Sequence, residues 1–274
     1  MTRKRHADHL RFFGGLRGGR PRLRIEHRQL TEGSVRPVSS TPDSQPVAVE
    51  HRQVRYQPLP GSTEILLVRH GESAPFRPGE PFPLVDGHGD PPLSPEGQEQ
   101  AIAVGGRLSG ETIHAIYVTS LQRTHETAAP LAARLGLQPR VEAELREVFL
   151  GQWEGGLLRQ KGAEGDPIYL QMQAAQDWGV IPGAESMAVL RARCVGAIET
   201  IHAAHPDQRV AVFVHGGVIA ALCAHATGSR PFAFNGADNG SIHHLVVLDG
   251  EWKLRCFNDT GHLGPFTAQG QALT

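Results

Sequence analysis

The chain has 274 residues, of which 39% are hydrophobic and 20% are charged, and its formal net charge is -1. These proportions supply enough apolar material for a sizeable core and exclude a fibrous or coiled-coil protein. No apolar stretch approaches the roughly 18 residues of a membrane-spanning helix, and no apolar segment of signal-peptide length follows the basic start.

The cysteines point to a reducing compartment. Cys194, Cys223 and Cys256 are odd in number and have no CxxC spacing, so neither a disulfide framework nor a zinc site is indicated. We therefore expect a cytoplasmic protein that binds no membrane.

Residues 1–60 differ in composition from the remainder. They carry twelve Lys or Arg against five Asp or Glu, a balance of +7, whereas the other 214 residues carry fifteen against twenty-three, a balance of -8. The stretches GGLRGGRPR and VRPVSSTPDSQP predict a basic, disordered extension. A basic arm can contact nucleic acid, but aromatic residues suited to base stacking are nearly absent, which argues against such a partner.

Strands and helices alternate from residue 61. EILLVRHG (64–71) is typical of a strand buried on both faces. A helix is predicted next, with Ser94 as N-cap and Pro95 as its first residue. IHAIYVTS (113–120) predicts a second strand, and 122–136 a helix that ends at Gly136. Pro130 is expected to kink or restart this helix.

The second half continues the pattern after an irregular stretch. Residues 151–182 read as a cap-like insertion over one end of the sheet, with a helix around 167–177. A longer helix follows within 183–207, with Ser186 as cap and one apolar face approximated by Val189, Cys194, Ala197, Ile198 and Ile201. Residues 209–228 predict a strand, a glycine pair and a helix, and Asp249-Gly250 predicts a hairpin within 241–259.

This order of elements predicts an α/β fold. Strands that alternate with helices favour a three-layer α/β/α sandwich with a mostly parallel central sheet, and the final hairpin predicts an antiparallel edge. We expect one domain over 61–274.

The predicted strands end in chemically similar sequences. The first ends at VRHG, the second at VTSLQR and the third at VFVHGG. Ligands of open α/β sheets bind beyond the carboxyl ends of the strands. Arg69, His70, Arg123 and His215 all fall there. Singly, each is better explained as a turn residue or a solvated charge, but together they indicate a site for an anion.

Four segments carry a family resemblance. LLVRHGES, VTSLQRTHETA, LREVFLGQWEG and VFVHGGVI resemble, in this order, the signature blocks of the histidine phosphatase superfamily, which has the phosphoglycerate mutase-like fold. The resemblance covers residues 64 to about 259, and LSPEGQEQA is similar to the family's helix-opening segment. Ser120 stands where members often have Pro or Asp. Residues 74–92 replace a compact segment of the mutases, so specificity is expected in 74–92 and 151–182.

The resemblance implies the roles of the strand-end residues. His70 would be the nucleophile and form a phosphohistidine. Arg69 and Arg123 would grip the phosphate oxygens with planar guanidiniums, and His215 would donate to the same phosphate. Gly216 would let the helix N-terminus approach the anion.

Two further site residues are expected less directly. On spacing alone Glu147 reads as an exposed loop carboxylate, but the family motif selects it, rather than Glu144 or Glu154, as the proton donor. The Ser73 hydroxyl is expected either to bind a phosphate oxygen or to cap local backbone.

The implied function is that of a phosphatase. It would hydrolyse a small phosphorylated substrate through phosphohistidine, with no metal or other cofactor. Two alternatives stay open: phosphoryl transfer of the phosphoglycerate mutase type, and a catalytically weak phosphate-binding module. GQWEGGLLRQKGAEGDP lacks the long basic stretch of the mutases, which favours the phosphatase. The sequence does not indicate an oligomeric state.

Other polar and aromatic residues are assigned no chemistry. Asp86, His88 and Asp90 read as solvated members of a Gly-rich loop. Asn239 either approaches the site from the next loop or, as turn chemistry favours, is a turn residue. His243 and His244 would point to opposite faces of a strand and could not share a metal. The tryptophans Trp153 and Trp178 either fill the core or line a pocket.

Overall fold

The structure, a computed structural model, describes residues 50–264. The chain divides at Gln53 and Val54, and every helix and strand below lies in the unit Val54–Thr274. Of the extension predicted to be disordered, 1–60, residues 1–49 lie outside the described residues.

A six-stranded sheet forms the centre of this unit, with the strand order β5-β4-β6-β1-β7-β8. β1 pairs in parallel with β6, β6 with β4, and β4 with β5, whereas β7 runs antiparallel to both β1 and β8. The strands are β1 Thr63–Arg69, β4 Ala115–Val118, β5 Arg140–Val141, β6 Arg209–Val214, β7 Ile242–Leu248 and β8 Glu251–Asp259. The predicted parallel sheet with an antiparallel edge is confirmed.

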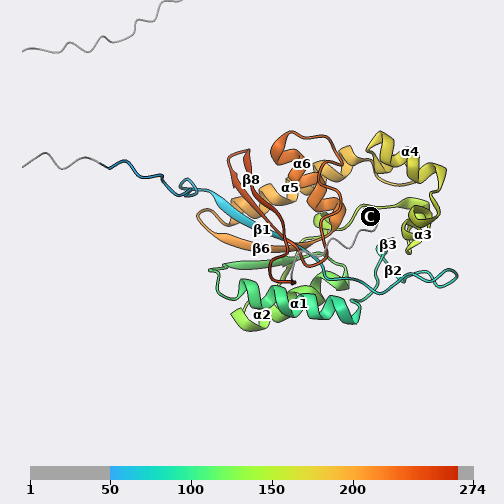
Figure 1. Cartoon of the computed structure of the whole chain (residues 1–274), viewed down its shortest axis with the longest axis horizontal. Helices are drawn as coiled ribbons and strands as arrows, with labels where there is room; N and C mark the ends of the chain where they lie inside the picture. Colours follow the sequence, from blue (N-terminus) through green and yellow to red (C-terminus); the bar gives the residue numbers. More distant parts are fainter. Residues whose placement is uncertain (1–49, 265–274) are drawn as a thin grey trace, which may run out of the picture. The chain divides into compact units, whose positions relative to one another are not determined.

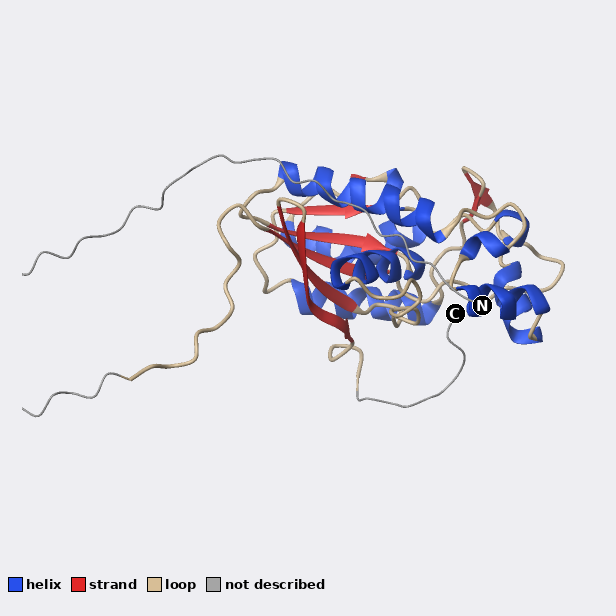
Figure 2. Cartoon of the chain, turned by 90° about the horizontal axis from the view of Figure 1, so that it is seen from above, coloured by secondary structure: helices blue, strands red, loops and turns tan. Residues whose placement is uncertain are grey.

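Helices cover both faces of the sheet (Figures 1 and 2). They are α1 Pro95–Leu108 and α2 Gln122–Leu135 on one face, and α5 Met187–Ala204 and α6 Gly216–Thr227 on the other. β1 shows why two layers of helices are needed. Ile65 and Leu67 pack into the core under α5 and α6, whereas Leu66 and Val68 pack into the core under α1 and α2. A strand that is apolar at every position needs cover on both sides, so the predicted α/β/α sandwich is confirmed.

Helix ends follow the local sequence. The side chain of Ser94 accepts a hydrogen bond from Gly97 N at 3.1 Å, and that of Ser186 accepts one from Val189 N at 3.3 Å. Gly136 closes α2 in the left-handed conformation, with φ 66°. Each of these ends was predicted from its capping residue.

The expectation of a restart at Pro130 is wrong, because α2 is one helix through this residue. A methyl group added at Gly105 of α1 would approach Pro130 Cβ to 2.9 Å. Gly105 therefore lets α1 lie directly on the proline.

The segment between β5 and α5 is more regular than expected. It holds α3 Leu157–Glu164, which the sequence analysis missed, α4 Pro167–Ala175, where a helix was predicted, and the 3₁₀ turns Ala143–Leu145, Gly151–Trp153 and Trp178–Val180. A small hairpin, β2 Leu84–Val85 with β3 His88–Gly89, lies in the segment after β1. Four of the residues predicted for the apolar face of α5 are buried, namely Cys194, Ala197, Ile198 and Ile201. Val189 is 54% exposed, so its assignment to this face was wrong.

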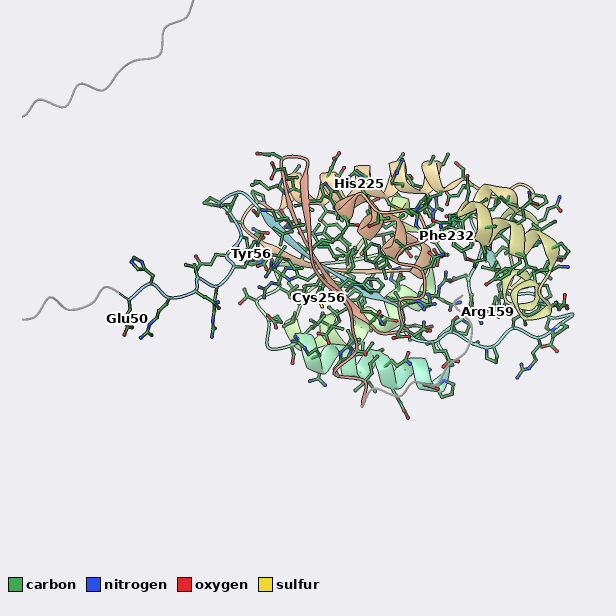
Figure 3. All side chains as sticks on the ribbon, turned by 45° about the horizontal axis from the view of Figure 1, so that its top comes forward. Glu50, Tyr56, Arg159, His225, Phe232 and Cys256 are labelled. Atoms are coloured by element: carbon green, nitrogen blue, oxygen red, sulfur yellow. The ribbon has the colours of Figure 1, made fainter. Side chains whose placement is uncertain are left out.

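The three cysteines differ in their exposure. Burial raises the pKa of Cys194 and of Cys223 to about 12, which makes both thiols unreactive. Cys256 is exposed on β8 (Figure 3).

The segment before β1 contacts β8, where the Arg255 guanidinium lies 3.8 Å from the centre of the Tyr56 ring. Among the described residues, no helix is long and apolar enough to cross a bilayer.

His243 supplies a test of this packing. It is fully buried, its Nδ1 accepts from Asn258 N at 3.1 Å, and its Nε2 lies 2.9 Å from Ser241 Oγ. Burial lowers its pKa to about 3. In the unfolded chain His243 takes up a proton near pH 6.5, whereas in the folded protein it does so only near pH 3. The free energy of unfolding therefore falls as the pH falls from about 6.5 to about 3. As the pH falls from about 6 to about 4, we expect the free energy of unfolding of His243→Asn to decrease less steeply than that of the parent. The difference in slope should be about 1.4 kcal/mol per pH unit.

Urea unfolding at several pH values measures this slope, and His125→Asn, on the exposed side of α2, is the control. Equal slopes for the His243→Asn variant and the parent would contradict the burial of a neutral His243.

Candidate active site

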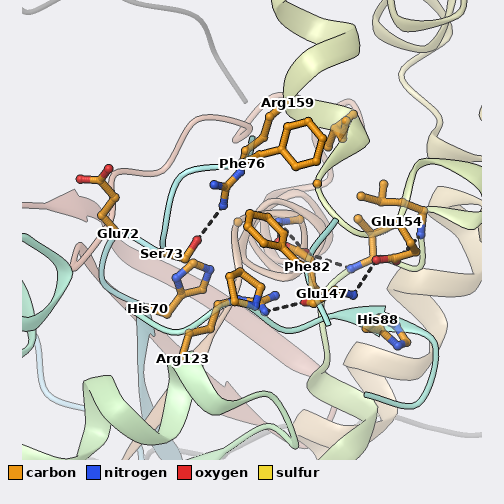
Figure 4. Close-up of a pocket in the computed structure, with 18 of the residues that line it drawn as sticks. His70, Glu72, Ser73, Phe76, Phe82, His88, Arg123, Glu147, Glu154 and Arg159 are labelled. Atoms are coloured by element: carbon orange, nitrogen blue, oxygen red, sulfur yellow. Dashed lines mark hydrogen bonds between the residues drawn. The ribbon is translucent and has the colours of Figure 1, made fainter. Parts of the chain in front are cut away.

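The carboxyl ends of β1, β4 and β6 meet at one pocket of about 650 Å³ (Figure 4). Arg69 ends β1 and His70 follows it, Arg123 lies in the first turn of α2, and His215 is the N-cap of α6. The structure therefore brings together the four residues that the strand-end sequences predicted. Arg69, His70 and Arg123 line the pocket, and the fully buried His215 lies next to the ring of His70.

Two glycines set the direction of the chain after His70. A side chain at Gly71 would collide with the Gly97 carbonyl group, and one at Gly97 would collide with Glu72. The amide of Gly71 donates to Thr127 Oγ1 at 3.0 Å. The loop after β1 can therefore lie directly on the first turn of α1, which explains why a glycine occupies both motifs.

The His70 ring has a defined tautomer. Its Nδ1 lies 2.7 Å from the Gly71 carbonyl oxygen. A carbonyl oxygen only accepts, so Nδ1 carries the hydrogen and Nε2 carries the lone pair. Burial, then the charges of Arg123 and Arg69, lower the pKa of His70 well below 6.5. The imidazole is therefore neutral near pH 7, the state in which its nitrogen can attack phosphorus.

His215 lies next to His70 inside the protein. Its ring centre lies 5.2 Å from that of His70, and it is fully buried. Its Nε2 lies 3.0 Å from Thr119 Oγ1, while Nδ1 has no hydrogen-bond partner among the described residues. Burial and Arg123 lower its pKa well below 6.5. A buried nitrogen without a partner is costly, and a ligand oxygen would satisfy it.

Two arginines give the pocket its positive charge. The Arg69 Nη1 donates to the carbonyl of Ala237, and its buried Nε has no partner in the described part of the chain. The Arg123 Nη1 donates to the Gly89 carbonyl at 2.9 Å. Burial lowers the pKa of Arg123 to about 10, so both guanidiniums stay charged at neutral pH. Unused donors on two fixed cations suit an anion with several oxygens.

Glu147 lies against the start of α6. Its Oε1 accepts from Val148 N at 2.9 Å and from Gly217 N at 3.1 Å. A methyl group at Gly217 would lie 2.7 Å from Oε1, so only glycine allows this approach. Both glycines of the predicted pair line the pocket; the Gly217 amide donates to Glu147, and Gly216 lies beside Arg69.

The Ser73 hydroxyl accepts a hydrogen bond from Arg159, a residue that was not predicted to belong to the site. Arg159 of α3 donates to Ser73 Oγ at 2.6 Å and to the Ala74 carbonyl at 2.9 Å. Both residues have side chains in the pocket. The missed helix explains the missed arginine, because nothing local places residue 159 beside residue 73.

The expectation that Asp90 and His88 are solvated is wrong, because both are buried. Asp90 Oδ1 accepts from Gln122 N at 2.9 Å and lies 3.7 Å from Arg123 Nη1. His88 packs against Phe149 with ring centres 5.4 Å apart. Asp86 is exposed, as expected, and pairs with Arg146. Asp90 thus fixes both the N-terminus of α2 and the guanidinium of Arg123.

Two other residues brace the pocket. Glu154 accepts from Gly89 N at 2.7 Å and from Leu150 N at 2.8 Å. Asn239 is more than a turn residue, since its amide donates to the His70 carbonyl at 2.9 Å. Trp153 fills the core, whereas Trp178 is buried in the core and also lines the pocket.

This arrangement can bind and activate a tetrahedral oxyanion. A neutral imidazole, two arginines and a carboxylate surround one space, and positioning with electrostatic stabilisation supplies most of phosphoryl-transfer catalysis. Within residues 50–264, no three His, Cys, Asp or Glu side chains are grouped so that they could hold a metal ion.

The fold and these residues define a class of protein. The family model of the histidine phosphatase superfamily (branch 1) matches residues 65–260. The chain belongs to this superfamily, as its four motifs indicated.

Individual relatives have phosphatase and mutase-like names. The chain is 33% identical over 206 residues to "Phosphoglycerate mutase-like protein 4" of Arabidopsis thaliana, covering 73% of this chain and 86% of that one. It is 32% identical to "Metal-independent phosphoserine phosphatase" of the same plant, covering 73% and 83%. Among solved structures, mycobacterial glucosyl-3-phosphoglycerate phosphatase complexed with VO3 has a TM-score of 0.61 at 29% identity, covering 71% of this chain and 98% of that one.

Proposed function

We propose that the protein is a phosphatase that hydrolyses a phosphomonoester through a phosphohistidine on His70, with Glu147 as proton donor. The observation that carries this proposal is the neutral His70 ring, held by its Nδ1–H between two charged arginines. Phosphatase names among the relatives support the reaction class. Cytoplasmic location stays a prediction from the sequence.

The reaction has two balanced steps. His70 Nε2 attacks phosphorus, the ester P–O bond breaks, and Glu147 gives its proton to the leaving alkoxide. Glu147 then takes a proton from water, whose oxygen attacks phosphorus and releases inorganic phosphate and His70. Arg69 and Arg123 hold the phosphoryl oxygens, and His215 holds one of them through Nδ1.

A mutase would use the same residues but retain the phosphoryl group for a second alcohol. The segment after Glu147 has two cations on α3, Arg159 and Lys161. Of these, Arg159 lines the pocket, whereas Lys161 pairs with Asp166 at 2.9 Å. A single cation there gives little support for holding a doubly phosphorylated intermediate, which favours hydrolysis.

The products distinguish the two reactions. The purified protein is mixed with 4-nitrophenyl phosphate, and separately with 3-phosphoglycerate and a bisphosphoglycerate primer. The proposal predicts release of inorganic phosphate from the first mixture and no 2-phosphoglycerate from the second. Formation of 2-phosphoglycerate would identify a mutase, and no reaction in either mixture would leave only a phosphate-binding module.

The contact between Gly217 and Glu147 predicts a measurable loss. In Gly217→Ala the added methyl would displace the carboxylate, and misplacing a catalytic group by about 1 Å costs on the order of 100-fold. We expect kcat/KM for an alkyl phosphomonoester to fall by about 10- to 100-fold. The control is Gly106→Ala on α1, where an added methyl meets nothing within 4 Å. Equal activity of the two variants would show that this contact does not position Glu147.

A further inference from the structure

The outer part of the pocket has an aromatic wall, defined as Phe76 and Phe82. Both are half-buried and line the pocket, with ring centres 5.9 Å apart in an edge-to-face arrangement. They come from the segment 74–92, which follows the nucleophile motif. In Figure 4, Phe76 is drawn beside Arg159 and away from Arg123, and Phe82 is drawn nearer to Glu147.

The wall is built into the protein. A methyl at Gly156 would collide with the Phe76 ring and approach Phe82 Cε2 to 2.9 Å, and Gly156 has φ 105°. Phe82 N donates to the Gly155 carbonyl at 2.9 Å. The rings therefore pack directly on the backbone before α3, in a place that only glycine permits.

Arg159 reinforces this apolar surface. Its guanidinium lies 5.2 Å from the centre of the Phe82 ring, and its two terminal nitrogens donate to Ser73 and Ala74. The guanidinium therefore lies over the Phe82 ring, one N–H of each terminal nitrogen has a partner in the chain, and Arg159 remains a cation of the pocket lining.

The other lining residues favour an apolar leaving group. Besides the aromatic wall, the pocket is lined by the apolar side chains of Pro75, Pro78, Pro91, Val148, Leu150 and Leu158. The carboxylates Glu72 and Glu154, the guanidinium of Arg159 and the amides of Gln160 and Asn235 also line it. A leaving group with its own carboxylate would lie among ring faces and near two like charges, with Arg159 as a cation beside it, whereas a flat apolar group would bury its surface against the rings. At about 650 Å³ the pocket is also far larger than a phosphate with a three-carbon acid needs.

We propose that the leaving alcohol of the natural substrate carries an aromatic or similarly flat apolar group, which packs against Phe76 and Phe82. This inference rests on the proposed phosphatase function. The phosphate binds at His70, Arg69 and Arg123, and the aromatic wall selects the ester by the apolar area that it buries.

The test compares three alkyl phosphomonoesters whose alcohols are similarly poor leaving groups: 2-phenylethyl phosphate, ethyl phosphate and phosphoserine. Burying a phenyl group predicts a kcat/KM about tenfold or more higher for 2-phenylethyl phosphate than for ethyl phosphate. Phe76→Ala should lower this ratio several-fold. Leu84→Ala, which truncates a 57% exposed side chain of the same segment, should keep the ratio of the parent.

Three results would overturn the inference: a ratio near one in the parent, a higher kcat/KM for phosphoserine than for 2-phenylethyl phosphate, or an unchanged ratio in Phe76→Ala. Both esters are assayed with the same preparation of each variant. Partial unfolding lowers both rates by the same factor and leaves their ratio unchanged. If ethyl phosphate is hydrolysed by the parent but not by His70→Ala, the proposed function survives such a failure. If no ester is hydrolysed, the proposed function fails as well.

Discussion

Replacing His70 by alanine is expected to lower kcat/KM for phosphomonoesters by about 10⁴-fold or more, the scale seen when a covalent nucleophile is removed. The neutral ring between Arg69 and Arg123 is the attacking group in our account. His70→Asn should be equally inactive, because a polar side chain of similar position still lacks the attacking imidazole nitrogen. Initial rates with 4-nitrophenyl phosphate measure the loss.

A second histidine-to-alanine variant is the control for the loss of an imidazole as such. His125→Ala removes an exposed imidazole from α2, two residues after Arg123, and should leave kcat/KM within about twofold. Thermal unfolding of each variant shows whether it is folded. A folded His70→Ala protein that keeps more than about a hundredth of the activity would refute the assignment of the nucleophile.

Replacing Glu147 by glutamine should produce a loss that depends on the leaving group. General acids contribute about 10² to 10⁴-fold, and an alkoxide needs its proton whereas 4-nitrophenolate does not. We expect kcat/KM to fall by this factor for ethyl phosphate and by less than about tenfold for 4-nitrophenyl phosphate. Because kcat/KM reports steps through phosphorylation of the enzyme, slow hydrolysis of phosphohistidine does not obscure the comparison.

Glu154→Gln is the control for this comparison. Glu154 lines the same pocket, but both its oxygens accept backbone amide hydrogens, from Gly89 and Leu150. Any loss in this variant should be the same for the two esters, because it would reflect displaced backbone. Equal losses for the two esters in Glu147→Gln would instead show that Glu147 does not protonate the leaving group.

The fold was predictable where its signals are local. The apolar run Ile65–Val68, the caps Ser94 and Ser186, and the closing Gly136 each specify their element from neighbouring residues. Pro130 misled because α2 continues through it as one helix, packed against Gly105, which is distant in the sequence. For α3 there was no clear signal, since its residues are only partly buried or exposed and show no clear apolar face.

The site was predictable in its centre and not in its support. Arg69, His70, Arg123 and His215 stand at strand ends, which a parallel sheet brings together. Glu147 required the family resemblance, because a carboxylate in a loop has no periodic signal. Its catalytic role remains a prediction.

Asp90 and Arg159 show the limit of sequence patterns in this protein. Each lies in a polar or glycine-rich stretch and looks solvated, yet one pairs with Arg123 and the other with Ser73. These partners are set by the tertiary contact of 74–92 with α2 and α3, which no local pattern encodes.

The central claim is that His70 carries the phosphoryl group, and trapping the intermediate tests it most directly. In Glu147→Gln, 4-nitrophenyl phosphate should phosphorylate the enzyme readily, whereas hydrolysis lacks its base, so phosphoenzyme should accumulate. The mixture is quenched in alkali, where phosphohistidine persists, and digested for mass spectrometry. We predict phosphate on the peptide that contains His70 and its loss in acid. Phosphate on another residue, or continued turnover with no phosphorylated peptide, would contradict the account.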